Sequence, residues 1–465
     1  MKKWIATVLA CIMALTLTAC GAQKADTTDG SNNQSNTAES NTKDGAKEPT
    51  EGAQTSTEKI HLIAPKTGFT EEQIQLEKDN AAKNGTDLPP AAQFYIGVTD
   101  KIAQEYPNYE MEYVDWGWAE TLDQKQRALI LSGTAPSLVA GETFMPVYAS
   151  SGMLEPLPQD IVDKVNPSFL LYDKEGRPVS VAYKSSVFLL FYNKTLMKNA
   201  GLDPENPPKT WEEWKQMSGA ITASGNGKVF GGGVPSFPHA GGSLRATPFF
   251  RQMGVDFGGG TTINLTDPKL QETLQFIREM NANFPAGLGN NSDEGPLWSE
   301  FQDKDKGTIG FAVNGSWQKA ALIENGYDWG VTALPLPQGG VEGNCMVGAV
   351  YVGVPVTAEH KEDCFNLIRV LLDDELQKFW LKEGTPSALN KYIDSDAEYP
   401  DDITLKAAAQ ALKGGTVSGL TTFDKNDAQV WEIINTKVLA RTTMTNDPID
   451  RICSEAQAEI ENLLK

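Results

Sequence analysis

Basic residues, histidine and cysteine are all scarce in this 465-residue chain. Its 40 lysines and arginines stand against 61 aspartates and glutamates, which gives a formal net charge of −21 at pH 7. Such an acidic surface repels nucleic acids, so we expect none as a partner. The 3 histidines are far apart, and no zinc-ligand or catalytic motif surrounds them. We therefore expect no metal, no cofactor and no enzymatic activity; a carboxylate-based carbohydrate-active enzyme is the less favoured alternative.

The 5 cysteines lack the spacing of a disulfide framework or a metal site. Two of them, Cys11 and Cys20, belong to the N-terminal apolar region. The other three, Cys345, Cys364 and Cys453, are widely separated, and we expect them to be buried as small hydrophobic residues.

Long apolar runs are also absent after the N-terminus. There, Lys2 and Lys3 precede WIATVLACIMALTLTA, which is typical of an export signal and is short for a membrane span. The following Leu-Thr-Ala-Cys sequence resembles the lipobox of bacterial lipoproteins, which implies a signal peptide over residues 1–19 and a lipid on Cys20. From there to residue 58 no large apolar residue occurs, so we predict a disordered linker over residues 20–58 that tethers a folded body.

The remaining sequence alternates strand-like and helix-like segments, which favours an α/β fold. Residues 109–114, YEMEYV, alternate as a half-buried strand does, and residues 90–106 carry apolar side chains at helical spacing after a proline. In KTWEEW, Thr210 and Glu213 have the spacing of a capping box, and the two tryptophans share one helix face. We expect both tryptophans in the core.

A series of motifs then occurs in one order along the body. They are IAQEYPNYEMEYVDW, LILSGTAPSLV, YASSGMLEPL, SSVFLLFYNKTLMKNAGL, PPKTWEEW, LWSEFQDKDKGTIGFAVNGSWQ, DWGVTALPLP and CMVGAVYVGVP. In this order they resemble the bacterial family 1 extracellular solute-binding proteins, the group that includes maltose-binding protein. The resemblance implies two α/β lobes of the type II periplasmic-binding-protein fold, joined by crossing hinge strands, with the ligand in the cleft between the lobes.

The resemblance also implies discontinuous lobes. The crossings are expected near residues 184–187, 331–335 and 384–388. Lobe 1 then consists of residues 59–185 and 335–383, and lobe 2 of residues 186–334 and 384–465. The segment 68–92 is longer than the corresponding loop of the family, and the sequence from Thr70 to Gln73 predicts the start of an inserted helix.

The function implied by the resemblance is transport. The protein would capture a sugar or oligosaccharide at the extracellular face of the cell membrane, anchored by its lipid, and deliver it to the transmembrane subunits of an ABC importer. We expect a monomer. The alternative is a binding protein of the same fold for a charged solute, such as a sugar phosphate or a polyamine. An anionic ligand would require convergent cations, and only Lys184 and Arg245 stand near the expected cleft loops.

Sugar sites combine a flat aromatic surface with a few aimed polar groups. Trp317 follows the strand-like TIGFAV and stands where family members place a stacking aromatic; its alternative is a core position. Glu142 and Thr143 follow the strand-like SLVA, and the resemblance implies that Glu142 replaces an aspartate that relatives carry at the position of Thr143. Further candidates lie at strand ends, at the first crossing or on helix-like stretches: Trp116, Trp118, Ser185, Ser186, Arg245, Gly348, Ala349, Trp298 and Trp431. The helical spacing around Trp298 and Trp431 also favours core packing.

Overall fold

The computed structural model describes residues 58–66, 71–117, 119–303, 305, 307–326, 328–342, 347–392, 401–412 and 419–465. The predicted signal peptide, Cys20, all of the predicted linker but its last residue, Trp118 and Cys345 lie outside these ranges. Within them, none of the helices combines the length and the apolar character that a bilayer span requires.

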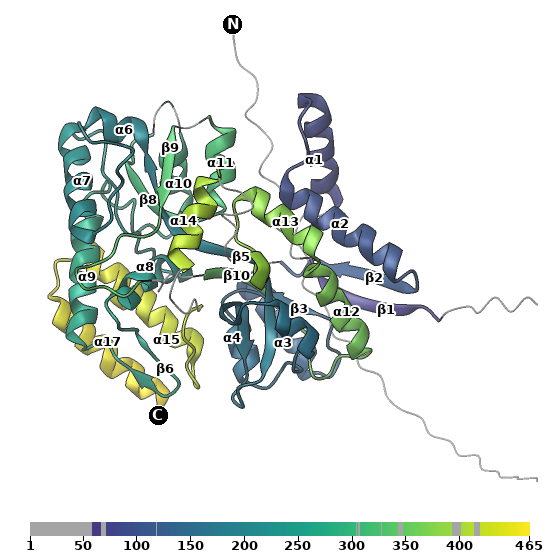
Figure 1. Ribbon diagram of the computed structural model, residues 1–465. Helices are drawn as coiled ribbons and strands as arrows, with labels where there is room; N and C mark the ends of the chain where they lie inside the picture. Colours follow the sequence, from purple (N-terminus) through teal and green to yellow (C-terminus); the bar gives the residue numbers. More distant parts are fainter. Residues whose placement is uncertain are drawn as a thin grey trace, which may run out of the picture. The chain divides into compact units, whose positions relative to one another are not determined.

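Strands and helices alternate along the chain, as the sequence predicts (Figure 1). The strands are β1 (Ile60–Pro65), β2 (Tyr109–Val114), β3 (Val139–Gly141), β4 (Leu170–Tyr172), β5 (Pro178–Asn193), β6 (Gly258–Gly259), β7 (Thr262–Ile263), β8 (Phe311–Gly315), β9 (Trp329–Thr332) and β10 (Val347–Gly353). The helices of the first half are α1 (Glu71–Asn84), α2 (Pro90–Glu105), α3 (Ala119–Leu131), α4 (Met145–Ser150), α5 (Gln159–Lys164), η1 (Pro167–Phe169), α6 (Lys194–Asn199) and α7 (Trp211–Ser224). Those of the second half are α8 (Ala240–Gln252), α9 (Pro268–Asn281), α10 (Gly295–Gln302), α11 (Gln318–Glu324), α12 (Lys361–Leu371), α13 (Asp374–Glu383), η2 (Asn390–Tyr392), α14 (Ile403–Leu412), α15 (Asp427–Ile433), the π-helix η4 (Ile434–Ala440), α16 (Arg441–Met444) and α17 (Ile449–Leu464).

The 16-residue strand β5 pairs with two sets of partners. Up to Val187, β5 pairs antiparallel with β10, and β10 in turn pairs with β3. The first residues of β5 also pair with β4. From Phe188 onward its partners are β8 and β9. The change of partners falls directly after the first crossing that the sequence predicts. Elsewhere, β1 and β2 form a parallel pair, and β6 and β7 form an antiparallel one.

Alternate side chains of β5 enter two different hydrophobic cores. Leu189 and Phe191 belong to the core that also contains residues of α2, α12 and α13. Phe188, Leu190 and Tyr192 belong to the core that contains residues of α7, α8, α9 and α17. Successive side chains of a strand point to opposite faces, so this strand is buried on both of them. The position of β5 therefore depends on both cores at once.

Several local predictions are confirmed. Helix α2 begins at Pro90, and residues 109–114 form a strand. The Thr210 hydroxyl accepts a hydrogen bond from the Glu213 N–H at 3.1 Å, and the Glu213 carboxylate accepts one from the Thr210 N–H at 3.2 Å, which completes the capping box. Both tryptophans of KTWEEW are buried in the core, at 8% and 0% exposure.

The second crossing is expected at residues 331–335. After it, Leu336 N–H donates to the carbonyl of Lys209, just before α7, and Val341 N–H donates to the carbonyl of Gln252, at the end of α8. The chain then pairs with the first half of β5 in β10. The lobe boundary at residue 335 stays a prediction.

The third crossing is expected at residues 384–388. There, the Ser185 hydroxyl donates to the carbonyl of Pro386, and Asn166 N–H donates to the carbonyl of Ala388. These contacts join the segment to the first half of β5 and to the loop after α5. Further along the chain, α14 packs against β9 and β5. The boundary at residue 384 stays a prediction.

Helix α1 is the insertion that the sequence predicts, although Thr70 itself lies outside the described residues. It lies beside α2 (Figure 1) and follows β1 in the chain. Since β1 still pairs with β2 along its full length, the insertion adds a helix without changing the strand register.

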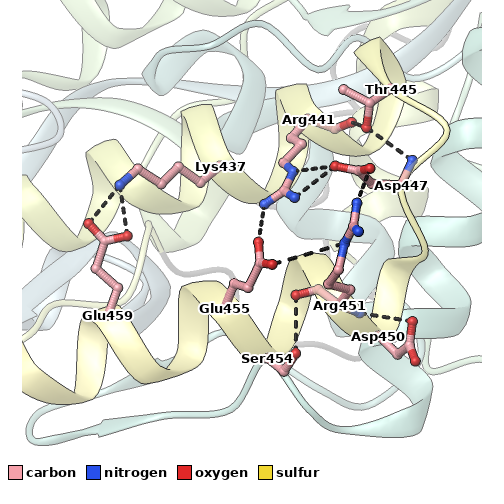
Figure 2. A network of polar contacts seen from close by, with 9 residues as sticks. All are labelled: Lys437, Arg441, Thr445, Asp447, Asp450, Arg451, Ser454, Glu455 and Glu459. Carbon is pink, nitrogen blue, oxygen red and sulfur yellow. Dashed lines mark hydrogen bonds and ion pairs between the residues drawn. The ribbon is translucent and has the colours of Figure 1, made fainter.

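Figure 2 shows the polar network that joins α17 to the helical segment before it. Its ion pairs connect Lys437, Arg441, Asp447, Arg451, Glu455 and Glu459. Arg441 is central, with nitrogen–oxygen distances of 2.7 Å to Asp447 and 2.6 Å to Glu455. These side chains are partly exposed, so each pair contributes little to stability. The buried face of α17, with Ile452, Cys453, Ala456, Ile460 and Leu464, supplies most of the packing.

Cys364 and Cys453 are free and fully buried, as expected. Burial raises the pKa of the Cys364 thiol to about 11 and that of the Cys453 thiol to about 12. Both remain protonated and unreactive at neutral pH.

The capping box gives a direct test of the local structure. We expect Thr210→Ala to lower the free energy of unfolding by about 1 kcal/mol, because the N-terminus of α7 loses its side-chain acceptor. Thr210→Ser keeps that hydroxyl and should restore most of the loss. Urea unfolding of the three proteins measures the difference; equal stability of the alanine and serine variants would contradict the assignment.

Candidate ligand-binding site

Trp317 is a large aromatic side chain left partly open to solvent, at 40% exposure. It lies between β8 and α11, and its ring meets Phe188 of β5 edge-on, with centroids 5.6 Å apart. A Cβ added at Gly348 of β10 would come within 3.6 Å of the indole, so the ring lies next to the backbone there. One part of the indole is thus fixed by packing and another is available to a ligand, which fits a stacking role better than a core role.

Arg245 is the most deeply buried charged group among the predicted site residues, at 4% exposure. Its guanidinium donates to the Gly241 carbonyl at 2.8 Å and to Asn314 Oδ1 at 3.0 Å, and it forms an ion pair with Glu294 at 3.0 Å. Asn314 in turn donates to Gln318 Oε1 at 2.7 Å. Burial lowers the pKa of Arg245 to about 10, so the guanidinium stays charged at neutral pH.

Aromatic rings surround this guanidinium. Its central carbon lies 4.7 Å from the ring centroid of Trp298, 5.6 Å from that of Phe237 and 5.8 Å from that of Phe188. Trp298 also donates from its indole nitrogen to Glu294 at 3.2 Å. Because Phe188 touches both Arg245 and Trp317, it joins the polar network to the exposed indole.

Three buried polar atoms around Trp317 have no hydrogen-bond partner in the described part of the chain. They are Arg245 Nε, Ser316 Oγ and Gln318 Nε2. A buried donor without a partner destabilises a protein, and native structures retain few of them. Ser316 and Gln318 are the chain neighbours of Trp317, and Arg245 contacts Phe188 beside it. A ligand or water at this position would supply the missing partners.

Lys184 and Glu142 lie in the part of the fold where β5 pairs with β10, before β5 changes partners at Phe188. Lys184 faces Val350 across the β5–β10 ladder, and the next β10 residue, Tyr351, faces Gly141 at the end of β3. Glu142 follows Gly141 in the chain, so its backbone lies opposite Val350 and about level with Lys184. Two strand spacings separate the Glu142 and Lys184 backbones, which is roughly 10 Å. Burial raises the pKa of Glu142 to about 7, and the positive charge of Lys184 partly offsets that rise. Thr143 beside it is exposed.

Lys184 makes no ion pair with any described residue; its ammonium lies 4.5 Å from the ring centroid of Trp380. Burial also raises the pKa of Glu383, and the positive charges of Lys184 and Lys319 partly offset that rise. Oε2 of Glu383 is a further buried atom without a partner in the described ranges. Lys319, by contrast, forms an ion pair with Asp402.

Ser185, Ser186, Gly348 and Ala349 form the stretch of ladder between Lys184 and Trp317. Ser186 pairs with Gly348, and Ser185 pairs with Ala349. The Ser186 hydroxyl donates to the Gly348 carbonyl at 2.7 Å, and a Cβ added at Gly348 would lie 2.8 Å from that hydroxyl. Glycine at this position therefore allows the close approach of the two strands beside the indole.

Lys184, Ser185 and Ser186 of β5 lie opposite Gly348 and Ala349 of β10 and near Glu142, and Trp317, Arg245 and Trp298 lie around Phe188, further along β5. Ser185, Ala349 and Arg245 are buried, and Ser185 points to the opposite face of β5 from Ser186. The surface along the middle of β5 is the more open part of this group, around Lys184, Gly348 and Trp317. Trp431 is not part of it: this side chain is 8% exposed, lies in the core with Phe257 and Phe423, and donates to the Thr421 carbonyl. Trp116 is half-buried against the first core, and no described contact joins it to this surface.

Sequence reasoning missed four residues that pack around Arg245 beside this surface: Phe188, Phe237, Glu294 and Asn314. Asn314 stands in the same AVNGSW stretch as Trp317, so its position after a predicted strand could have identified it. Phe188 is part of a buried apolar run, which gives no sign of its contact with the site. Phe237 and Glu294 are joined to Arg245 only by the tertiary fold.

The raised pKa of Glu142 predicts how stability depends on pH. The folded state holds this proton up to about pH 7, while the unfolded chain releases it near pH 4.5, so the folded state loses stability as pH rises between these values. Glu142→Gln should raise the free energy of unfolding at pH 8 by roughly 1–3 kcal/mol and change it little at pH 4. Urea unfolding at both pH values measures this. Glu110→Gln, at an exposed position of β2, is the control; an equal effect there would refute the assignment.

Three comparisons with known proteins agree with this architecture. The family model of the bacterial extracellular solute-binding proteins matches residues 85–378. The sn-glycerol-3-phosphate-binding periplasmic protein UgpB of Yersinia pestis is 28% identical over 202 residues, 40% of this chain and 45% of that protein. The chain therefore matches less than half the length of this curated relative.

Solved structures show the same fold at low sequence identity. The sugar-binding protein MalE from Xanthomonas citri has a TM-score of 0.67 at 16% identity, over 87% of this chain and 97% of that one. UgpB from Mycobacterium tuberculosis, in complex with glycerophosphocholine, has a TM-score of 0.63 at 18% identity, over 81% and 96%. The predicted type II fold is confirmed, and the chain belongs to the bacterial extracellular solute-binding protein family.

Proposed function

We propose that this protein captures a neutral, hydroxyl-rich solute, a sugar or an oligosaccharide, at the surface along the middle of β5. The observation that carries the proposal is the exposed indole of Trp317 beside a buried polar network with unpaired donors. A sugar presents apolar C–H faces to an aromatic ring and hydroxyl groups to donors and acceptors. The combination found here matches both needs.

The charges of the surface favour a neutral ligand over an anion. The guanidinium of Arg245 is already neutralised by Glu294. Lys184 is the remaining cation, and its charge acts on the two buried carboxyl groups of Glu142 and Glu383. A phosphate brought here would meet carboxylates as well as the lysine, and in a buried setting such repulsion is weakly screened.

A phosphorylated polyol is the second candidate. Curated relatives are named sn-glycerol-3-phosphate-binding proteins, and a solved structural neighbour is in complex with glycerophosphocholine. Within the described residues Lys184 has no carboxylate at ion-pair distance, so it is the group that would bind a phosphate. Protonation of Glu142 near pH 7 would remove part of the repulsion.

The mechanism we infer is closure on the ligand. Glu142 and Lys184 belong to the part of the fold built on β3, β10 and the first half of β5, whereas Trp317 and Arg245 belong to the part built on β8 and α8. A ligand that contacts both parts stabilises the arrangement in which they are close. The closed, loaded form would then be recognised by the transmembrane subunits of an ABC importer, while a lipid on Cys20 holds the protein at the extracellular face of the membrane.

Calorimetric titration with maltotriose, other oligosaccharides, glycerol 3-phosphate and glycerophosphocholine tests the ligand class. For the bound sugar, Trp317→Ala should weaken binding at least about tenfold, because a central aromatic contact is lost. Trp317→Phe keeps a flat ring and should lose less. Binding of the two phosphorylated compounds alone would overturn the neutral ligand in favour of the second candidate.

The same variants separate a ligand role from a core role. Since Trp317 is 40% exposed, its truncation should change the free energy of unfolding little. Truncation of the fully buried Trp214 should cost roughly 3–5 kcal/mol. If Trp317→Ala instead unfolds as easily as Trp214→Ala and binds sugar with native affinity once folded, the indole does not belong to the site.

The anchor is tested separately. Cys20→Ala should abolish incorporation of a tagged fatty acid in growing bacteria, because the lipid requires the thiol. A cell that carries the unchanged gene gives the reference signal. Persistent label on the variant would show that the lipid, if present, is attached elsewhere.

A further inference from the structure

A cavity of about 420 Å³ is lined by residues of the inserted helix α1, helix α2 and the strands β1 and β2. This volume is within the range of small-molecule sites, roughly 300–1,000 Å³. No residue assigned above to the solute site lines it. Most of its wall is apolar, with contributions from Ile74, Val98, Ile102, Met111, Leu138 and Leu367.

The lining of the cavity combines buried apolar residues with exposed charged ones. Val98, Leu138 and Leu367 are buried side chains that also belong to the first core. Lys78 and Asp100, in contrast, are exposed. Core-like and solvent-accessible residues thus line one cavity, which matches a molecule with an apolar chain and a charged head.

The helix that covers the cavity is weakly packed. Along α1, Ala81 is the side chain that is buried among those described, and Leu76 is 57% exposed. Protein interiors are normally close-packed, because atoms that line a void lose their dispersion contacts. An occupant between α1 and α2 would restore those contacts to both the helix and the core beneath it.

The lining carries a local excess of positive charge in an acidic protein. Lys66 at the end of β1 and Lys78 of α1 both line the cavity, and neither forms an ion pair with a described residue. Asp100 is the acidic residue of the lining. Two ammonium groups against one carboxylate, in a chain of net charge −21, favour an anionic head group.

We propose that this cavity binds a single-chain amphiphilic carboxylate, a fatty acid of medium length. The alkyl chain would lie against Val98, Leu138 and Leu367, and the carboxylate would lie between Lys66 and Lys78. This site is independent of the solute site, so either ligand can be tested without the other.

Titration of the purified protein with octanoate, decanoate and dodecanoate below their micellar concentrations tests the proposal. We expect saturable binding whose affinity rises about tenfold for each added pair of methylenes, until the chain fills the cavity. The double variant Lys66→Gln, Lys78→Gln should weaken decanoate binding about tenfold and leave binding of uncharged decanol unchanged. Lys83→Gln, on the same helix but outside the lining, is the matched control and should have no effect.

A steric variant completes the test. Thr99 is exposed at the lining, so Thr99→Trp should occupy the cavity without loss of the fold and abolish decanoate binding. A melting curve confirms that the variant is folded. Absence of saturable binding, affinity independent of chain length, or equal effects of Lys83→Gln and the double lysine variant would overturn the proposal. So would binding to phosphatidylglycerol vesicles without any binding of the free carboxylates, since the cavity would then accept a membrane lipid.

Discussion

The fold depends on one strand that is shared by two hydrophobic cores. β5 changes partners between Val187 and Phe188, and its alternate side chains enter different cores on its two faces. A strand under this constraint tolerates no shift of register, because a slip by one residue would exchange its two faces. The backbone at the change of partners is therefore held firmly, and it is the place where the predicted site residues gather.

This position explains the composition of the site. Arg245 is buried and pairs with Glu294, whose side chain is 38% exposed. Burial of the guanidinium costs desolvation free energy, which the ion pair offsets in part. Its geometry is nevertheless well defined, since Asn314 and the ring of Phe188 hold the guanidinium from two sides. Polar groups held in fixed positions would orient a ligand, whereas the exposed indole of Trp317 offers it only an apolar face.

The sequence predicted those features that depend on neighbours along the chain. Helix α2, the capping box at Thr210 and the core tryptophans follow from local spacing and local hydrogen bonds. Local spacing does not reveal bonds such as the one from Leu336 to Lys209, which joins residues more than a hundred positions apart. The same reason applies within the site: the rings around Arg245 come from three different segments, and the raised pKa of Glu142 arises from burial that no motif encodes.

The place of helix α1 has a consequence for the evolution of this chain. The helix enters between β1 and α2, yet every pair from Ile60–Tyr109 to Pro65–Val114 remains in register. A gene can therefore lengthen or shorten this connection while the sheet and the shared strand stay intact. Natural variation in length is tolerated at such a point, and lineages can acquire new surface there at little cost to the ancestral scaffold.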